Sequence, residues 1–169
     1  MKPNIGEPAP DFEVTAIGGK YSQETQVKLT DFAGQKVILF FYPKDLTPGW
    51  NNQACAIRDQ WGELKDKAKI FGVSPDSIES HKKFISKKSL PFSLISDPDR
   101  NLIGPYGVAG EKSVLGKALF SITERSTFII DEDGKISHIL EKVSPTKHLD
   151  DLLDALEQSE YSWKQWVMF

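Results

Sequence analysis

Short apolar runs alternate along this chain with stretches in which apolar residues recur every three or four positions. The run at 37–42, Val-Ile-Leu-Phe-Phe-Tyr, is too short for a helix and is typical of a strand buried on both faces. A turn follows at 47–49, and from about Trp50 one apolar helical face continues through Ala54, Ile57, Trp61, Leu64 and Ala68. The pattern therefore predicts a buried strand, a short loop and a helix whose N-terminus favours a negative charge.

The same change of period recurs further along the chain. Additional strands are predicted at 70–74, 91–96 and 126–131, and helices at 75–88 and near residues 102–103. A tight turn at 132–134 makes 135–140 an antiparallel partner of the strand before it, because so short a connection cannot serve a parallel crossover. Strands that alternate with helices indicate an α/β fold with parallel neighbours in the sheet.

The two ends of the chain carry simpler signals. Residues 1–35 combine an irregular lead-in with short strands, a hairpin turn at Gly18-Gly19 and a short helical turn at 29–34. Pro145 opens a last helix whose apolar face is formed by Leu149, Leu152, Leu153 and Leu156. No repeat, linker or low-complexity segment divides the chain, so residues 1–169 are expected to form one domain.

Composition narrows the class of protein. The chain has 21 Lys plus Arg against 24 Asp plus Glu, a formal charge of -3, and so no basic surface for nucleic acid or an anionic membrane. Its longest apolar run, 37–42, is far shorter than the about 20 residues of a membrane span. Residues 1–12 lack the apolar core of a signal peptide, and one cysteine excludes an intrachain disulfide. A cytoplasmic location is the expectation.

Several motifs in the chain are shared with one known family. They are the opening GEPAPDF, the segments GVSPDS, SHKKF, LPF and SDPD, and above all the loop after the first apolar run. With them, the chain resembles a peroxiredoxin of the bacterioferritin comigratory protein (peroxiredoxin Q) type over roughly residues 5–158. The family pattern is Pro-x-x-x-Thr-x-x-Cys, with a second cysteine downstream in many members. Pro43 and Thr47 fit this pattern. Cys55 occupies the second, resolving position, and Trp50 stands where the peroxidatic cysteine belongs.

The resemblance implies a thioredoxin-like fold with a mixed central sheet flanked by helices, and makes residues 159–169 an aromatic C-terminal extension. It also implies a reaction in which a thiolate attacks hydrogen peroxide or an alkyl hydroperoxide, with thioredoxin as electron donor. Arg125 fits the family pattern Arg-x-Thr-Phe and would stabilise the thiolate. Thr47 would orient the thiolate and the peroxide, and Pro43 would shield the pocket from water.

Trp50 changes this expectation, because an indole has no ionisable atom that can replace a thiolate. An engineered knockout, an error in the sequence and natural divergence are the open explanations. Asn51-Asn52 also departs from the Thr or small residues of the family, which favours natural divergence. The leading interpretation is a peroxiredoxin that has lost its peroxidase activity. The alternatives are an active thiol peroxidase seen in altered form, and a binding or chaperone-like module that uses the former pocket.

The remaining reactive side chains give weaker signals. Cys55 lies on or beside the apolar helical face and is predicted to be a small buried hydrophobe with an unreactive thiol. His81, His138 and His148 show no ligand spacing with Cys55, so no metal or cofactor site is expected. The expected partners are a peroxide and thioredoxin if the chain is active, with both a monomer and a homodimer open. The aromatic residues 161–169 are expected to pack on their own domain or on a second copy.

Overall fold

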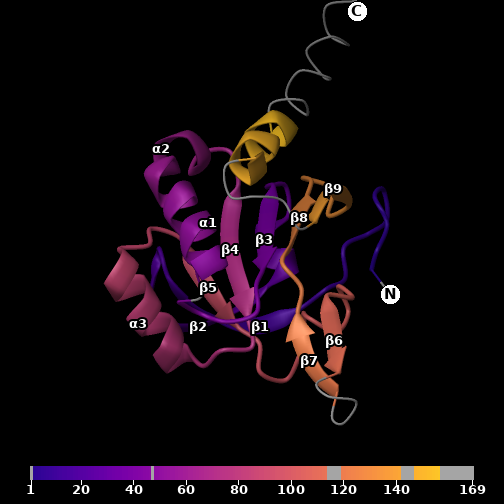
Figure 1. Cartoon of the computed structure of the whole chain (residues 1–169). Coiled ribbons are helices and arrows are strands. Elements are labelled where there is room, and N and C mark those ends of the chain that lie inside the picture. The colour runs from indigo at the N-terminus through magenta and orange to yellow at the C-terminus, as the bar shows by residue number, and fades with distance from the viewer. Residues whose placement is uncertain (1, 47, 114–118, 142–146, 157–169) are drawn as a thin grey trace, which may run out of the picture.

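A computed structural model describes residues 2–46, 48–113, 119–141 and 147–156. Its centre is a 7-stranded sheet (Figure 1). The strands, in spatial order, are β2 (Tyr21–Lys28), β1 (Glu13–Gly18), β5 (Ser93–Ser96), β4 (Lys69–Ser74), β3 (Val37–Phe41), β8 (Ser126–Ile130) and β9 (Ile136–Glu141). β3, β4 and β5 are parallel, and the other pairs are antiparallel. The predicted mixed sheet is confirmed.

β3 is buried along its whole length, as its apolar run predicts, and lies between β4 and β8. Its side chains alternate between two cores: Val37, Leu39 and Phe41 belong to one, and Ile38 and Phe40 to the other. Tyr42 was predicted to be the last strand residue but lies just beyond β3. Its N–H still donates to the carbonyl of Val73 at 3.0 Å.

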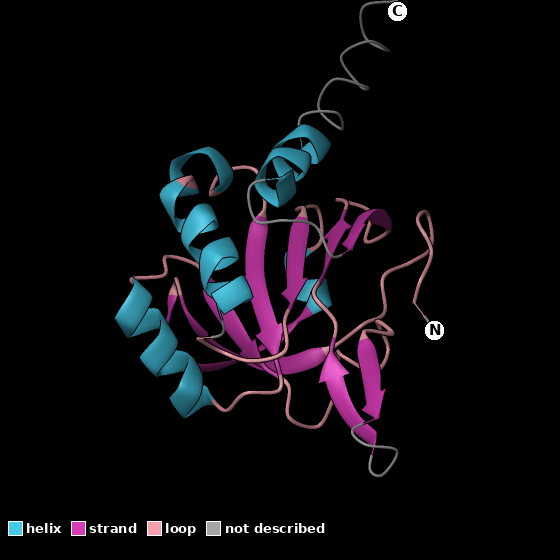
Figure 2. Cartoon of the chain, viewed as in Figure 1, coloured by secondary structure: helices cyan, strands magenta, loops and turns pink. Residues whose placement is uncertain are grey.

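Helices contribute side chains to the second of these cores. Figure 2 shows the helices in cyan beside the magenta sheet. They are α1 (Pro48–Asp59), α2 (Trp61–Leu64), α3 (Ile78–Lys88) and a helical segment at 147–156. α1 begins after the loop that follows β3, so the predicted order of strand, loop and helix is confirmed. The Ser77 hydroxyl accepts the backbone N–H of Ser80 and so caps α3, which begins slightly later than predicted.

The opposite core is covered by the 3-10 turn η1 (Leu29–Phe32) and by residues 101–108. The prediction of a short helix near 102–103 was wrong, since residues 101–107 form successive turns. The physical reason lies within the segment: Pro105 has no N–H to donate to the carbonyl of residue 101, and Gly107 takes a left-handed φ of 66°. The carboxylate of Asp97 accepts the backbone N–H groups of Asn101, Leu102 and Ile103 at 2.8, 3.0 and 2.8 Å and so fixes the start of these turns.

A small antiparallel sheet, formed by β6 (Ala109–Ser113) and β7 (Leu119–Thr123), was not predicted. Ala-Gly-Glu-Lys-Ser has no alternation of apolar and polar residues, so this strand gives no sequence signal. The last predicted helix is present over 147–156, and its expected start at Pro145 lies outside the described residues. The extension 159–169 and the packing expected for 161–169 also lie outside them.

Candidate functional site

The candidate site lies at the edge of the sheet where β3 ends. The chain leaves β3 through Pro43 and reaches α1 at Pro48. β8 runs antiparallel to β3, and Ser126 pairs with Phe41, so β8 begins at the edge where β3 ends. The fold therefore brings Pro43, the N-terminus of α1 and Arg125, which directly precedes β8, to one edge of the sheet.

Pro43 and Arg125 are both half-buried at this edge. The first turn of α1 leaves backbone N–H groups without helical partners, and together with a guanidinium they can favour an anion there. Thr47 lies outside the described residues, and for Trp50 only the helical backbone is described. The catalytic roles that the family pattern gives these residues stay predictions.

Two buried oxygen atoms at this edge lack a hydrogen-bond partner within the described part of the chain. One is Oδ1 of Asn51, in the first turn of α1, and the other is Oγ of Ser126, the first residue of β8. Buried polar atoms normally find partners, and exceptions call for an explanation. Both exceptions flank the positions to which the sequence assigns chemistry.

Cys55 lies beyond the first turn of α1 as a free thiol. Its neighbours Ala54 and Ile57 are fully buried, whereas Cys55 itself is half-buried. It therefore lies beside the buried helical face, and the prediction of a buried small hydrophobe holds only in part.

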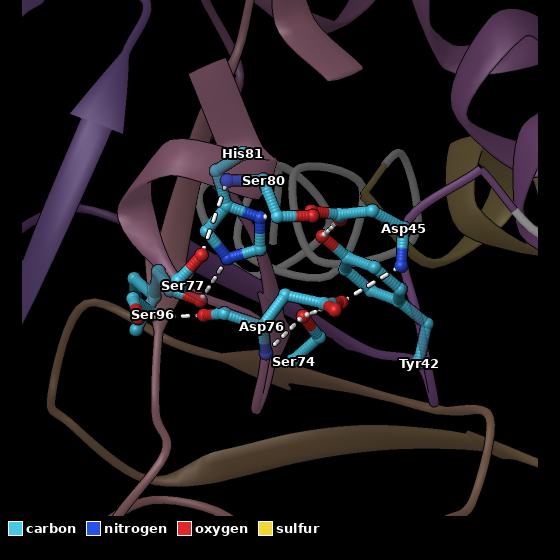
Figure 3. A network of polar contacts seen from close by, with 9 residues as sticks. Tyr42, Asp45, Ser74, Asp76, Ser77, Ser80, His81 and Ser96 are labelled. Atoms are coloured by element: carbon cyan, nitrogen blue, oxygen red, sulfur yellow. Dashed lines mark hydrogen bonds and ion pairs between the residues drawn. The ribbon is translucent and has the colours of Figure 1, made fainter. Parts of the chain in front are cut away.

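A network of buried polar side chains lies beneath the loop (Figure 3). Asp45 accepts the Tyr42 hydroxyl at Oδ1, at 2.6 Å, and the Ser80 hydroxyl at Oδ2, at 2.8 Å. The same Oδ2 lies 2.7 Å from Nδ1 of His81, whose Nε2 lies 2.9 Å from the carbonyl oxygen of Ile95. The side chains of His81 and Asp45 are 0% and 2% exposed. Asp45 is thus tied to Tyr42 just after β3, to α3 and, through His81, to β5.

Asp76 extends this network to the end of β4. Its Oδ2 accepts the backbone N–H of Asp45 and the hydroxyl of Ser74, both at 2.7 Å. The Ser96 hydroxyl donates to the Asp76 carbonyl oxygen at 2.6 Å (Figure 3). Because these groups come from the ends of β4 and β5 and the start of α3, several elements fix the backbone of Asp45.

The sequence pattern assigned His81 no role, since it showed no metal-ligand spacing. Its partner Asp45 is 36 residues away, and only the packing of α3 beside the loop brings the two together. One signal was available: His81 recurs with Ile78 and Phe84 on the apolar side of a helix. A histidine in such a position needs buried hydrogen-bond partners.

A second buried histidine, His148, lies on the helical segment 147–156. Its Nε2 is 2.7 Å from Oγ1 of Thr127, on β8, and its ring centroid is 5.1 Å from that of Phe40. Burial lowers the pKa of His148 to about 4, against a smaller opposite effect of the Asp151 charge. Thr127 is part of the Arg-x-Thr-Phe segment, so this contact joins the strand of the candidate site to the last helix.

A cavity of about 110 Å³ lies near the other end of β4, where Lys69 and Ile70 line it together with aromatic residues. Its position separates it from Pro43 and Arg125, so it is not part of the candidate site.

Across the described ranges, no group of three or more His, Cys, Asp and Glu side chains could hold a metal ion. In that same part of the chain, every helix is too short or too polar to span a bilayer.

The sheet order, the helices and the loop before α1 define a thioredoxin-like fold of the peroxiredoxin kind. The model of the AhpC/TSA family matches residues 5–139. Peroxiredoxin Bcp of Escherichia coli K12 is 41% identical over 154 residues, which cover 90% of this chain and 95% of the relative. Peroxiredoxin Bcp of Bacillus subtilis is 40% identical over 158 residues, which cover 93% and 97%. The solved structure of Xanthomonas campestris peroxiredoxin Q has a TM-score of 0.79 and 34% identity, covering 87% of this chain and 90% of that one. The chain belongs to the AhpC/TSA family, within its peroxiredoxins of the Bcp or peroxiredoxin Q type.

Proposed function

We propose that this chain is a Bcp-type peroxiredoxin without its peroxidatic cysteine, whose thiol peroxidase activity is lost or severely impaired. The cysteine count carries this proposal: of 169 residues only Cys55 is a cysteine, and it lies beyond the first turn of α1. Residue 50, in that first turn, is where the family pattern requires the thiolate, and it is tryptophan. An indole offers peroxide oxygen neither an ionisable group nor a comparable nucleophile.

The other parts of the family pattern support a peroxide as the substrate of a restored site. Pro43 and Arg125 share one sheet edge with the N-terminus of α1, and Thr47 completes the motif. A solved Xanthomonas campestris bacterioferritin comigratory protein is described by its alkyl peroxide reduction activity. Hydrogen peroxide and alkyl hydroperoxides are therefore the proposed substrates, thioredoxin the reductant and the cytoplasm the compartment.

Cys55 is assigned the resolving position. In a restored enzyme the thiolate at residue 50 attacks the peroxide O–O bond, forms a sulfenic acid and releases water or an alcohol. The Cys55 thiol then attacks the sulfenic sulfur, which forms a disulfide and releases water. In the unaltered chain no sulfenic acid forms at residue 50, so Cys55 has no redox partner within the chain.

The decisive experiment compares the unaltered chain with Trp50→Cys in a peroxide assay coupled to thioredoxin and its reductase. The unaltered chain should turn over no faster than the background. Trp50→Cys should gain activity, and one equivalent of peroxide should produce a disulfide between residues 50 and 55. Recovery is expected to be partial, because a misplacement of about 1 Å can cost on the order of a hundredfold.

Matched variants make the result specific. Trp50→Cys combined with Cys55→Ser should lose the disulfide, and Trp50→Ala should stay inactive. Robust activity of the unaltered chain would overturn the proposal and give Cys55 the peroxidatic role. An inactive Trp50→Cys would place the binding-module alternative first, and a cysteine codon at position 50 of the encoding gene would identify an altered form of an active enzyme.

The reactivity of Cys55 gives an independent check. Since the thiol is half-buried beside a packed helical face, it should react with a thiol reagent about tenfold or more slowly in the native protein than after denaturation. The rate of thionitrobenzoate release measures this ratio. Equal rates in both states would make Cys55 an accessible redox thiol and reopen the function assigned to it.

A further inference from the structure

Both ring nitrogens of His81 face hydrogen-bond acceptors. Nε2 lies 2.9 Å from the carbonyl oxygen of Ile95, which cannot donate, so Nε2 must carry a proton. Nδ1 lies 2.7 Å from Oδ2 of Asp45, a distance that also requires a proton between the two atoms. A neutral imidazole has only one N–H. The second proton therefore belongs either to the ring, as an imidazolium, or to Asp45, as a carboxylic acid.

The surroundings of Asp45 favour the carboxylate. Its oxygens accept the Tyr42 hydroxyl at 2.6 Å and the Ser80 hydroxyl at 2.8 Å, and donors of this kind stabilise the ionised form. Burial, reinforced by the Asp45 charge, raises the pKa of the Tyr42 phenol well above its ordinary value, so Tyr42 keeps its proton and donates. The carboxylate of Asp76 accepts the Asp45 backbone N–H. It is the remaining acidic group of the network.

We infer that His81 is a buried imidazolium paired with the Asp45 carboxylate, and that it acts as a positioning residue for the loop between β3 and α1. Buried ion pairs persist only where the geometry is good and further hydrogen bonds satisfy both partners. Here both carboxylate oxygens of Asp45 and both ring nitrogens of His81 have a partner within 2.9 Å. The pair joins the loop to α3, and through Ile95 to β5.

The backbone of the loop shows what this pair stabilises. Leu46, the residue after Asp45, has a φ of 61°, a left-handed conformation that is rare outside glycine and strained for a leucine. Leu46 is 37% exposed, and its side chain belongs to neither of the two cores. The hydrogen bonds to the side chain and the backbone N–H of Asp45 stabilise the left-handed conformation of Leu46, which lies shortly before the first turn of α1.

The charge state is tested by NMR of the full chain with ¹⁵N-labelled histidine at pH 7. His81 should show both ring nitrogens protonated, whereas His148 in the same sample should show the spectrum of a neutral ring. Asp45→Asn removes the counter-ion but keeps a side chain that can hydrogen-bond, and should leave His81 with one N–H. A wild-type His81 with an unprotonated Nδ1 would place the proton on Asp45 and overturn the inference.

The positioning role is tested by amide hydrogen exchange in His81→Gln, with His148→Gln as the matched control. The Leu39 amide in β3 reports global unfolding and serves as the reference. Relative to that reference, the Asp45 amide should exchange at least about tenfold faster in His81→Gln than in the wild type. In His148→Gln the two amides should change by the same factor. Equal factors in His81→Gln would overturn the positioning role. Both measurements use the unaltered residue 50, so they can fail or succeed independently of the proposed loss of peroxidase activity, on which this inference does not rest.

Discussion

Two buried histidines lie against aromatic rings of the same core, one against Phe40 in β3 and the other against Tyr42 just after β3. Their hydrogen-bond partners and their charges nevertheless differ. His148 packs on Phe40 with ring centroids 5.1 Å apart, and His81 lies 6.4 Å from the ring of Tyr42. Their exposed fractions are 2% and 0%. His148 meets a hydroxyl, which can donate or accept, and His81 meets a carboxylate and a carbonyl oxygen.

The difference shows that burial alone does not decide what a histidine does in a core. An apolar setting with one adaptable partner keeps the ring of His148 neutral, and burial lowers its pKa to about 4. Two acceptors, one of them a carboxylate, surround His81, and in the inferred charge state each of its ring nitrogens carries a proton. The first histidine contributes packing between β8 and the last helix, and the second one fixes the loop of the candidate site.

Removing the carboxylate should have the largest effect on stability. Asp45→Ala leaves His81 buried without a counter-ion and Tyr42 and Ser80 without an acceptor. Loss of one partner of a buried pair costs about 3 to 5 kcal/mol, which urea unfolding at pH 7 would measure. Asp66→Ala, at an exposed position, is the control and should change stability by less than about 0.5 kcal/mol. A loss below about 1 kcal/mol for Asp45→Ala would contradict the contrast between the two histidines.

Acid should act on the other histidine. The pKa of His148 is about 4 in the folded protein against an ordinary value of 6.5, so below pH 6.5 the unfolded chain binds this proton more readily. Stability should fall as the pH falls, by about 3 kcal/mol at pH 4 from this group. His148→Gln has no such proton-binding group, so its stability should not include this loss. Between pH 7 and pH 4, the unfolding free energy of the wild type should therefore fall by about 3 kcal/mol more than that of His148→Gln. Parallel curves for the two proteins would show that His148 is accessible to protons when folded.

The smallest effect is expected from the hydroxyl partner of His148. Thr127→Val keeps the shape of the side chain but leaves Nε2 of His148 buried without a partner. Such a loss costs about 1 to 2 kcal/mol, measured as a shift of the urea midpoint. Thr30→Val, at an exposed position of η1, serves as the matched control and should be neutral within about 0.5 kcal/mol. If the two substitutions have the same effect, the hydrogen bond of His148 contributes nothing to stability.

Features encoded by local periodicity could be predicted from the sequence, whereas features that depend on tertiary packing could not. β3 and α1 are encoded by local periodicity, and their order placed the loop of the candidate site correctly. The turns at 101–107 contain Pro105, a local signal that the helix prediction did not weigh, whereas β6 has no alternating pattern to find. Pro43 and Arg125 were found through a family motif. The pairing of Asp45 with His81 is a product of tertiary packing and left no trace in the spacing of the chain.

The register of β3 with β8 also bears on the order in which the molecule assembles. Val37 pairs with Ile130, 93 positions later in the chain, and non-local contacts of this kind slow folding. During synthesis, β3, α1 and the network of Asp45 and His81 leave the ribosome before Arg125 and β8 exist. The loop can therefore be set by its own anchors in a nascent chain. Arg125 reaches the site only when β8 pairs with β3, so the two sides of the site come together in a long-range step.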